Sequence, residues 1–256
     1  MIYYIKKIPV IFLFFVCFFY MLASIFFQTS IFAADTAAEK ENHPFELLKQ
    51  RLVNDGFNEV LINKIYDNPE IEFNSKSVSQ FFKHNESKLN YGKFKADKLI
   101  EQVRQYIKKN KKDFLQVEEK YGVEKKIIAA IILVETRLGT YTGKNVVLTT
   151  LSTMATLSDQ AAKNKLWQSM SQKGRLSMDD FNKKARKRSK WAYNELKAFI
   201  RYTDGENIDS NKILGSYAGA MGIAQFMPSN ILTLAIDGNN DGNNDVELTV
   251  RQSLLR

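Results

Sequence analysis

The stretch IIAAIILVETRLGTYTG, residues 127–143, joins a long apolar run directly to an acidic side chain, Glu135. Its first eight residues carry no polar side chain. By periodicity alone such a run also fits a buried strand. The alanines, the preceding Glu-Lys-Lys and the total length over 123–139 favour a buried helix instead. On that helix Glu135 shares a face with Ile131 and Ile132, so we expect both isoleucines to face the core.

The same placement predicts the chemistry of Glu135. A carboxyl group at the rim of an apolar wall loses hydration, which disfavours its charged form and raises its pKa. A carboxylic acid that stays protonated near neutral pH is what a glycosidic oxygen needs as a general acid. The alternative is an ion pair between Glu135 and Arg137 or a nearby lysine, with no further role. Taken by itself, the sequence of this helix favours the ion-pair interpretation of Glu135.

From Pro44 onward the pattern of the chain is mainly α-helical. Residues 72–95 lack a clear periodicity and are expected to be irregular. Residues 162–190 are strongly basic and are interpreted as a solvated helical face or an insertion. Alternating strand patterns are almost absent, so the expected fold class is mainly α. The segments that predict helices are 45–56, 57–69, 95–110, 111–122, 123–139, 146–157 and 191–205.

The N-terminus has the pattern of an export signal. Lys6 and Lys7 precede an apolar run over residues 9–27, and the small residues Ala33 and Ala34 follow it. This is a positive region, a hydrophobic region and a cleavage site in the usual order. The run is nearly as long as a membrane-spanning helix. We favour a cleaved signal peptide over an uncleaved anchor, and both predict a place in the periplasm or cell envelope.

Charge and cysteine content narrow the class of partner. The chain has a net charge of +9 and a pI of about 9.4, which favours an anionic partner: nucleic acid, a membrane surface or an acidic polymer. Export points away from nucleic acid and towards an envelope polymer or the membrane. The only cysteine, Cys17, lies inside the N-terminal apolar run, so the exported domain has no disulfide and depends on its core for stability.

A second constellation is GSYAGAMGIAQFMPS, residues 215–229, where glycines and alanines surround a few polar side chains. Small residues let the backbone approach a neighbour or a ligand closely. Gln225 lies in an otherwise apolar turn and needs hydrogen-bond partners if it is buried. One interpretation is a tight helix–helix contact with a satisfied glutamine. The other is the floor of a groove, where Ser216 and Gln225 bind a sugar or orient the acid.

The segment VETRLGTYTGKNVVLTTLSTMA followed by GSYAGAMGIAQFMPSN resembles the lytic murein transglycosylase B family, which cleaves peptidoglycan. The upstream segments YGVEKKIIAAIILVETR and LNYGKF fit the same pattern, and the resemblance runs from about residue 45 to 245. It implies a lysozyme-like helical domain with one catalytic carboxylate, here Glu135. It also implies that Ser216 and Gln225 line the site, and that Tyr91 and Arg188 contribute to substrate binding.

The resemblance implies a reaction at the β-1,4 bond between N-acetylmuramic acid and N-acetylglucosamine. Glu135 protonates this bond and then takes a proton from the sugar's own C6 hydroxyl, which closes a 1,6-anhydro ring. Most glycosidases use two carboxyl groups, but an intramolecular nucleophile is already in place. No second acid stands out near either motif. The alternatives are a non-catalytic murein-binding protein, which belongs to another class, and a hydrolytic lysozyme.

The segment DGNNDGNNDVEL, residues 237–248, has the spacing of a calcium-binding loop. Position 12 should be acidic but is Leu248. The resemblance includes a similar loop, so this segment is either a weak structural calcium site or a flexible connector. We expect that the reaction itself requires no cofactor. The candidate ligands are Asp237, Asn239, Asp241, Asn243 and Asp245.

These observations predict three segments. Residues 1–34 form the signal peptide or membrane anchor, residues 35–43 a flexible tether, and residues 44–256 the lysozyme-like catalytic domain. The last residues, TVRQSLLR, do not match the family's expected continuation. We therefore expect the domain to be incomplete at its C-terminus and to lack part of the groove. The expected partners are peptidoglycan glycan strands and, through the N-terminal segment, the membrane, with no nucleic acid.

Overall fold

The computed structural model describes residues 44–83, 91–170 and 176–235, with only the backbone of Tyr91 and Lys93. The chain divides into two units at Glu46, and apart from Glu46 itself the described helices and strands belong to the second unit, from Leu47 onward. The predicted signal segment, tether and calcium loop lie outside the described residues. No helix in the described part of the chain combines the length and the apolar character that crossing a membrane requires.

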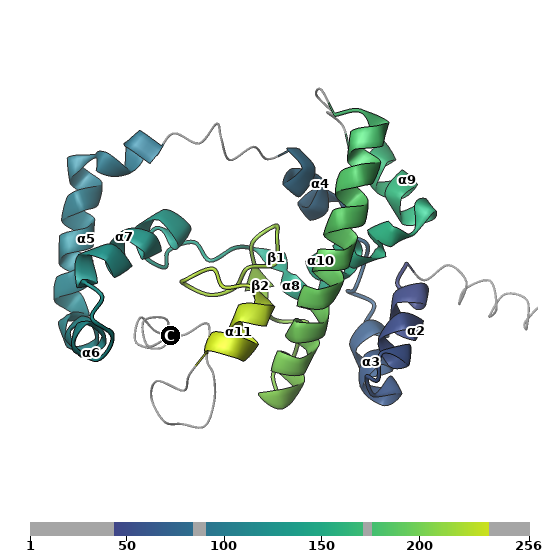
Figure 1. Ribbon diagram of the computed structural model, residues 1–256, viewed down its shortest axis with the longest axis horizontal. Helices are drawn as coiled ribbons and strands as arrows, with labels where there is room; N and C mark the ends of the chain where they lie inside the picture. The colour runs from purple at the N-terminus through teal and green to yellow at the C-terminus, as the bar shows by residue number, and fades with distance from the viewer. Residues whose placement is uncertain (1–43, 84–90, 171–175, 236–256) are drawn as a thin grey trace, which may run out of the picture. The chain divides into compact units, whose positions relative to one another are not determined.

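The described residues are mostly helical, as the sequence predicts (Figure 1). The helices before the first strand are α2 (Glu46–Asn54), α3 (Glu59–Tyr66), α4 (Ser75–Lys83), η2 (Tyr91–Lys95), α5 (Asp97–Lys109), α6 (Lys111–Tyr121) and α7 (Lys125–Thr136). Those after it are α8 (Val147–Ala155), η3 (Thr156–Ser158), α9 (Gln160–Ser169), α10 (Met178–Gly205) and α11 (Pro228–Leu234).

Helix α8 is the centre of the larger packing group. All of its residues are buried, and it packs against the long helix α10. Two of its buried polar groups have partners at short distance, as buried polar groups usually do. Ser152 shares a 2.6 Å hydrogen bond with the Tyr66 hydroxyl, and the Ser189 hydroxyl donates to the Ala155 carbonyl at 2.6 Å. The core is therefore fixed in register by hydrogen bonds as well as by apolar contact.

Helices α5, α6 and α7 form a second packing group. Its buried centre is Phe114, Val117, Ala129 and Ile132, with Val103, Tyr106, Ile107, Ile128, Leu138 and Ile223 packed around it. Helix α6 ends at Gly122, which adopts a left-handed conformation with φ of 69°, as expected for a glycine that closes a helix. Ile223 belongs to the later glycine-rich segment, so this group reaches across the sequence to the second motif.

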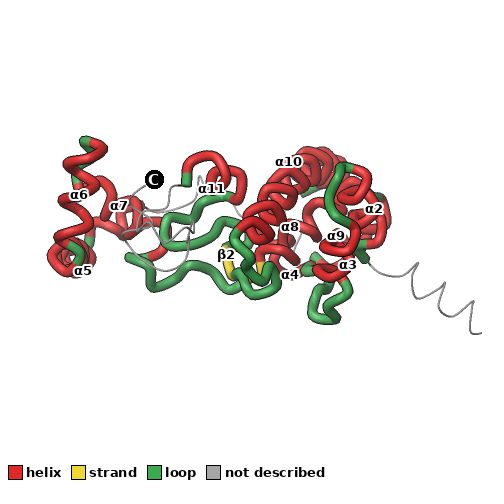
Figure 2. Tube along the Cα trace, turned by 90° about the horizontal axis from the view of Figure 1, so that it is seen from below, coloured by secondary structure: helices red, strands yellow, loops and turns green. Residues whose placement is uncertain are grey.

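The glycine-rich segment forms turns and short bridges, not a helix. Strand β1 (Asn145–Val146) pairs antiparallel with β2 (Leu214–Gly215). Isolated antiparallel β-bridges join Gly215 to Met221 and Met221 to Phe226, so the chain makes two successive turns before α11. Figure 2 shows these loops and the short strand among the helices. The interpretation of this segment as a helix–helix contact is therefore wrong.

The expectation that residues 72–95 are irregular is also wrong. They contain α4 and η2. The side chain of Asn74 accepts a hydrogen bond from the Ser77 amide at 2.9 Å, which satisfies a free amide in the first turn of α4. Val78 and Phe82, four residues apart, are buried and hold α4 against the rest of the domain. In the sequence, the serine, lysine and asparagine residues around Val78 and Phe82 make this helical spacing of apolar residues difficult to recognise.

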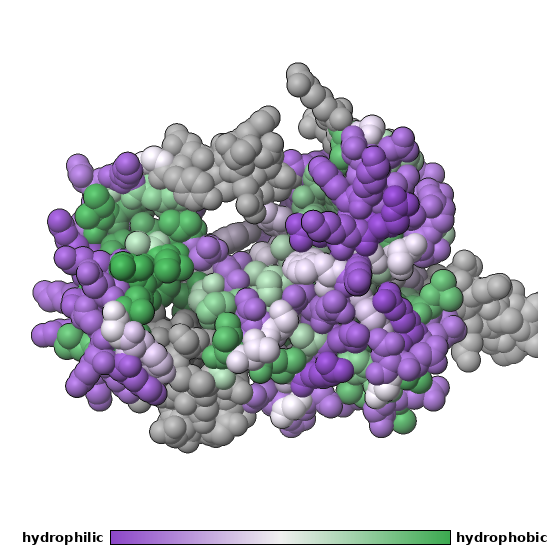
Figure 3. Space-filling model, viewed as in Figure 1, coloured by the Kyte–Doolittle hydropathy of each residue, from purple (hydrophilic) through white to green (hydrophobic). Residues whose placement is uncertain are grey.

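The basic segment over residues 162–190 is divided between two helices: residues 162–169 lie in α9, and residues 178–190 form the first half of α10. Helix α10 starts at Met178, and the hydroxyl of Ser177 caps it by accepting from the Asp180 amide at 3.1 Å. In Figure 3 a strongly hydrophilic surface covers its first half. The exposed basic side chains there are Lys183, Lys184, Arg186, Lys187 and Lys190, while Phe181, Ala185 and Ser189 are buried on the opposite side. The interpretation as a solvated helical face is confirmed for residues 178–190, whereas in α9 Lys163 is buried.

Candidate active site

Glu135 lies in the last turn of α7. The helix ends at Thr136 because the next three residues, Arg137, Leu138 and Gly139, all have positive φ. The amide of Arg137 donates to the Leu133 carbonyl, and that of Leu138 to the Ile132 carbonyl, so the helix end is closed by backbone hydrogen bonds. Glu135 is therefore held on regular helix, one residue before a sharp change of direction.

The face of α7 that carries Glu135 is exposed. Ile132 is 2% exposed, as expected, but Ile131 is 53% exposed, so the expectation that it faces the core is wrong. Helices α5 and α6 cover the side of α7 that holds Ala129 and Ile132, and Ile131 points away from them. Ile127, also 53% exposed, lies four residues earlier. Ile127, Ile131 and Glu135 thus form an exposed stripe that is apolar up to the carboxyl group.

The electrostatic prediction for Glu135 is confirmed in direction. Partial burial of its carboxyl group raises the pKa above the ordinary value, and desolvation is the cause. Within residues 44–83, 91–170 and 176–235, Glu135 has no ion-pair partner. Arg137 instead lines a cavity between α5 and α7. The ion-pair interpretation of Glu135 therefore finds no support, and a raised pKa keeps more of the carboxyl group protonated at a given pH.

Thr136, the residue after Glu135, ties α7 to the glycine-rich segment. Its side chain is fully buried, and its hydroxyl donates to the Ile223 carbonyl at 2.8 Å. The Ile132 carbonyl lies farther from the same hydroxyl, at 3.3 Å, so the bond to Ile223 is the better one. The same oxygen accepts from the Gly139 amide at 3.0 Å. This bond brings the end of α7 to the loop that carries Ser216 and Gln225.

Gln225 is satisfied by backbone carbonyls. It has a φ of 52°, and its side-chain nitrogen donates to the Thr142 carbonyl at 2.9 Å and to the Gly222 carbonyl at 3.0 Å. An amide nitrogen has two hydrogens, so both are used. The side-chain oxygen is the atom that remains to accept a bond from a ligand. Gln225 therefore links the loop to the segment after α7 and presents an acceptor.

Ser216 shapes its own turn. Its hydroxyl oxygen accepts from the Ala220 amide at 3.0 Å and from the Ala218 amide at 3.3 Å. Its backbone amide donates to the Ala220 carbonyl at 2.8 Å, which closes the turn from the other side. With the oxygen used as an acceptor, the hydroxyl hydrogen is left to donate. Ser216 is half-buried, so that hydrogen can meet a ligand at the surface of the loop.

Two glycines allow the close backbone contacts in this region. A Cβ atom on Gly143, which has a φ of 110°, would lie 2.0 Å from the Gly215 carbonyl oxygen. A Cβ atom on Gly215 would lie 2.3 Å from the Ala220 carbonyl oxygen. Neither distance is possible for a real side chain. The sequence prediction that small residues permit close approach is confirmed here, and the partner is the backbone of the domain itself.

Arg188 reaches the same loop through aromatic rings. Its guanidinium group lies 4.2 Å from the ring centre of Phe81 and 5.0 Å from that of Trp191. The Phe81 ring is 6.4 Å from the ring of Tyr217, the neighbour of Ser216. Sequence reasoning missed Phe81 and Trp191, because Phe81 counts only once α4 is recognised as a helix. The backbone of Tyr91 lies in η2, and its side chain is outside the description.

A second carboxylate lies near the site segment but has a structural role. Glu195 of α10 is 7% exposed, and its two oxygens accept from the Ser229 amide and the Ser229 hydroxyl, both at 2.9 Å. Ser229 is in the first turn of α11, so Glu195 satisfies a free amide there and anchors α11 to α10. Sequence reasoning missed this pair, since 34 residues separate its members.

Comparison with known proteins identifies the family of the chain. The chain belongs to the transglycosylase SLT domain family, whose model matches residues 40–254. It is 34% identical over 122 residues to the membrane-bound lytic murein transglycosylase B of Escherichia coli (strain K12), a match that covers 48% of this chain and 26% of that protein. The family resemblance inferred from the sequence motifs is thus confirmed.

Solved structures of the same kind confirm the fold. The soluble lytic transglycosylase SltB1 from Pseudomonas aeruginosa matches with a TM-score of 0.63 at 22% identity, covering 83% of this chain and 63% of that one. SltB3 from the same organism, solved in complex with NAG-NAM-pentapeptide, matches with a TM-score of 0.58 at 18% identity, covering 82% and 50%. The described domain therefore has the helical, lysozyme-like fold of lytic transglycosylases, and the chain covers about half to two thirds of the length of these two structures.

Proposed function

We propose that this chain is a peptidoglycan lytic transglycosylase that cleaves the β-1,4 bond between N-acetylmuramic acid and N-acetylglucosamine. The observation that carries the proposal is the hydrogen bond from Thr136 to Ile223, which joins the acid-bearing end of α7 to the loop of Ser216 and Gln225. Family membership supports it, and so does the glycan–peptide ligand named for SltB3.

Glu135 would serve as both acid and base. Its protonated carboxyl group donates a proton to the glycosidic oxygen as the bond to C1 of N-acetylmuramic acid breaks, and N-acetylglucosamine leaves as an alcohol. The carboxylate then takes the proton of the C6 hydroxyl while that oxygen bonds to C1. The 1,6-anhydro ring forms and Glu135 regains its proton. Since the nucleophile is part of the substrate, no second carboxylate is needed, which agrees with the structural role of Glu195.

Four other side chains would bind the glycan. The Ser216 hydroxyl can donate, and the free side-chain oxygen of Gln225 can accept, on the surface of one loop. Arg188 supplies a cation held by Phe81 and Trp191, and Tyr91 would add a hydroxyl from η2. The substrate is an envelope polymer, so we propose that the chain acts in the periplasm or cell envelope, with residues 1–34 as a signal peptide or membrane anchor.

The test of this function is the Glu135→Gln variant of the full chain on purified sacculi. We expect anhydromuropeptide release to fall by roughly 100-fold or more, the usual effect of losing a general acid, while the fold and binding to sacculi are unchanged. Mass spectrometry separates anhydro ends from reducing ends, which are heavier by one water. Glu119→Gln, an exposed acid on α6, is the matched control and should keep full activity. Release from Glu135→Gln at the wild-type rate would contradict the role of Glu135.

A non-catalytic murein-binding protein is the second candidate, because the side chain of Glu135 is exposed. Wild-type chain that binds sacculi and releases no fragment would favour it. Release of reducing ends only would favour a hydrolytic lysozyme.

We also propose a weak structural calcium site at Asp237, Asn239, Asp241, Asn243 and Asp245. Oxygen ligands at this spacing suit calcium, although the usual acid at position 12 is replaced by Leu248. Calcium at millimolar concentration should raise the melting temperature of the wild-type chain, and Asp241→Asn should remove that shift. An equal shift in the variant would count against the site. Magnesium, which prefers six ligands in a tighter shell, is the control ion.

A further inference from the structure

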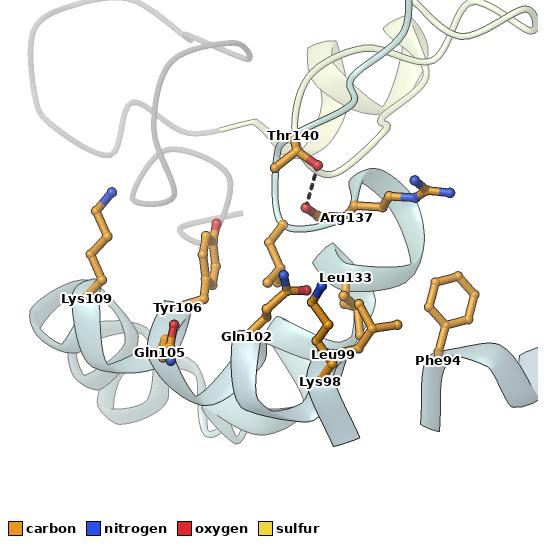
Figure 4. A pocket seen from close by; sticks show the side chains of 11 residues that line it. Phe94, Lys98, Leu99, Gln102, Gln105, Tyr106, Lys109, Leu133, Arg137 and Thr140 are labelled. Carbon is orange, nitrogen blue, oxygen red and sulfur yellow. Dashed lines mark hydrogen bonds between the residues drawn. The ribbon is translucent and has the colours of Figure 1, made fainter. Parts of the chain in front are cut away.

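A cavity of about 700 Å³ lies between α5 and the end of α7. Its long wall is one face of α5, where lining residues recur three and four positions apart from Lys98 to Lys109. Leu133 of α7 and Arg137, the residue after its end, also line the cavity, and Phe94 of η2 lies towards one end (Figure 4). The cavity is therefore built from elements of the second packing group and not from the glycine-rich loop.

The cavity is on a different side of α7 from Glu135. Leu133 and Arg137 are four residues apart in sequence and line the same cavity. Glu135 lies midway between them, about 200° round the helix axis from Leu133, so its side chain points to the other side. A ligand in this cavity would not occupy the place of the reacting bond.

The cavity is positively charged. Lys98, Lys109 and Arg137 line it, and within the described residues none of them has an acidic partner. Gln102 and Gln105 add side-chain amides from the same face of α5. Glu101 of the same helix accepts hydrogen bonds from Arg104 and from Gln105, both at 3.4 Å. The cavity thus offers an excess of donors and cations to an anion.

Tyr106 gives the cavity an unused hydroxyl group. Its ring packs edge-on against Phe114, with ring centres 6.0 Å apart, and stands upright from α5 in Figure 4. Its hydroxyl oxygen is buried and has no hydrogen-bond partner in the described part of the chain. Burial raises the pKa of the phenol to about 12, so the group stays protonated and can donate. A buried hydroxyl without a partner is destabilising, and an acceptor group on a ligand would remove that cost.

The remaining walls are the apolar Phe94, Leu99, Leu133 and Leu138, together with Thr140, whose hydroxyl donates to the Arg137 carbonyl at 2.9 Å. A fully hydrated small anion makes no favourable contact with apolar walls. A ligand that carries both carboxylates and aliphatic side chains can pack against these walls and pair with the cations at the same time. We propose that this cavity binds an acidic peptide through its carboxylate groups, namely the stem peptide attached to the glycan strand. The assignment of the peptide rests on the proposed function, because a peptidoglycan substrate brings such a peptide to the domain.

The test is calorimetric titration of the full chain with the free stem pentapeptide, released from muropeptides by an amidase. Lys98→Gln with Lys109→Gln should weaken binding about tenfold or more, since bonds to charged groups contribute about 1.5–3 kcal/mol. Tyr106→Phe should weaken binding several-fold and leave the melting temperature unchanged or higher. A purely structural role of the hydroxyl would not give that combination. The matched control is Lys108→Gln with Lys112→Gln, which removes the same charge outside the cavity and should bind within twofold of wild type.

The inference is overturned if the wild-type chain does not bind the pentapeptide, or if the cavity variant and the control bind equally. It is also overturned if inorganic phosphate competes as well as the peptide, because the site would then select charge alone. Binding needs no turnover, so the same titration is made with Glu135→Gln. Peptide binding with no release from sacculi would support this inference while the proposed function fails. Release from sacculi with no peptide binding would support the proposed function while this inference fails.

Discussion

The hydroxyl of Thr136 lies 2.8 Å from the carbonyl oxygen of Ile223, although 87 residues separate them in the sequence. Thr136 follows Glu135 directly, and Ile223 precedes Gln225 by two residues. A single buried hydrogen bond therefore fixes the position of the acid relative to the loop that would bind the sugar. The Gly139 amide completes the contact by donating to the same hydroxyl.

Replacing Thr136 by valine keeps the shape of the side chain and removes this bond. The Ile223 carbonyl and the Gly139 amide would lose their partner, so the free energy of unfolding should fall by about 1–3 kcal/mol. Release from sacculi should fall as well, because Glu135 and the loop are no longer held together. Thr233→Val, which removes an exposed hydroxyl that bonds within α11, should change stability by less than about 1 kcal/mol. Equal losses in the two variants, measured by urea unfolding, would contradict this role of Thr136.

The pH dependence of release should report the environment of Glu135. The acid works in its protonated form, so activity should fall as pH rises through its pKa, and desolvation places that fall at a higher pH than for an ordinary glutamate. Ile131→Asn brings a polar group to the neighbouring turn and should move the fall to lower pH. Ile131→Leu keeps the apolar surface and should leave it in place. The measurement is kcat/KM against pH, and identical profiles for the two variants would refute the desolvation argument.

The same pKa predicts how stability depends on pH. Because the folded-state pKa of Glu135 is raised, the folded chain binds more protons than the unfolded chain between the two pKa values, and this carboxyl group opposes folding increasingly as pH rises through that window. Glu135→Gln should therefore be as stable as wild type at low pH and at least as stable at neutral pH. Melting curves at several pH values test this. A Glu135→Gln variant that is less stable than wild type only above this pH window would contradict the argument.

Gly143 should tolerate no side chain. A Cβ atom would meet the Gly215 carbonyl oxygen at 2.0 Å, and a φ of 110° is costly for any other residue. We expect Gly143→Ala to destabilise the domain by about 2 kcal/mol or more and to reduce activity by displacing β1 from β2. Gly205→Ala, at the end of α10 with open space around it, should be neutral or stabilise by up to about 1 kcal/mol. Similar melting temperatures for the two variants would show that the β1–β2 contact is looser than described.

Glu195 and Ser229 should be coupled in a double-mutant cycle. Glu195→Ala removes both bonds to Ser229, and Ser229→Ala removes the one from the hydroxyl, so their effects should overlap and leave a coupling energy of about 0.5–3 kcal/mol. Strictly additive effects in denaturant unfolding would mean that the two side chains act independently. The cycle also tests whether Glu195 has a catalytic role, because a structural residue should affect release only as far as it affects folding.

The sequence predicted the helices well where local signals agree. Gly122 closes α6 and Ile132 faces the core, as their spacing implies. Ile131 was placed wrongly, since periodicity shows which residues share a face but not how much of that face neighbouring helices cover. Residues 215–227 were ambiguous, because glycine and alanine suit both a tight helix contact and turns. Only the distant partners of the loop, Thr136 and Thr142, decide between these, and no local pattern contains them.

The bonds that assemble the site span 83 and 87 residues, whereas the helices around it are stabilised largely by contacts within each helix and between neighbours. Closing so long a loop is entropically costly, so it is favourable only after α8 and α10 have come together. The acid and its loop should hence come together late in folding and separate early on partial unfolding. Mild denaturant should then abolish turnover while the circular dichroism of the helices is still that of the native chain, and the amides of Gly139 and Met221 should exchange with deuterium before those of α8.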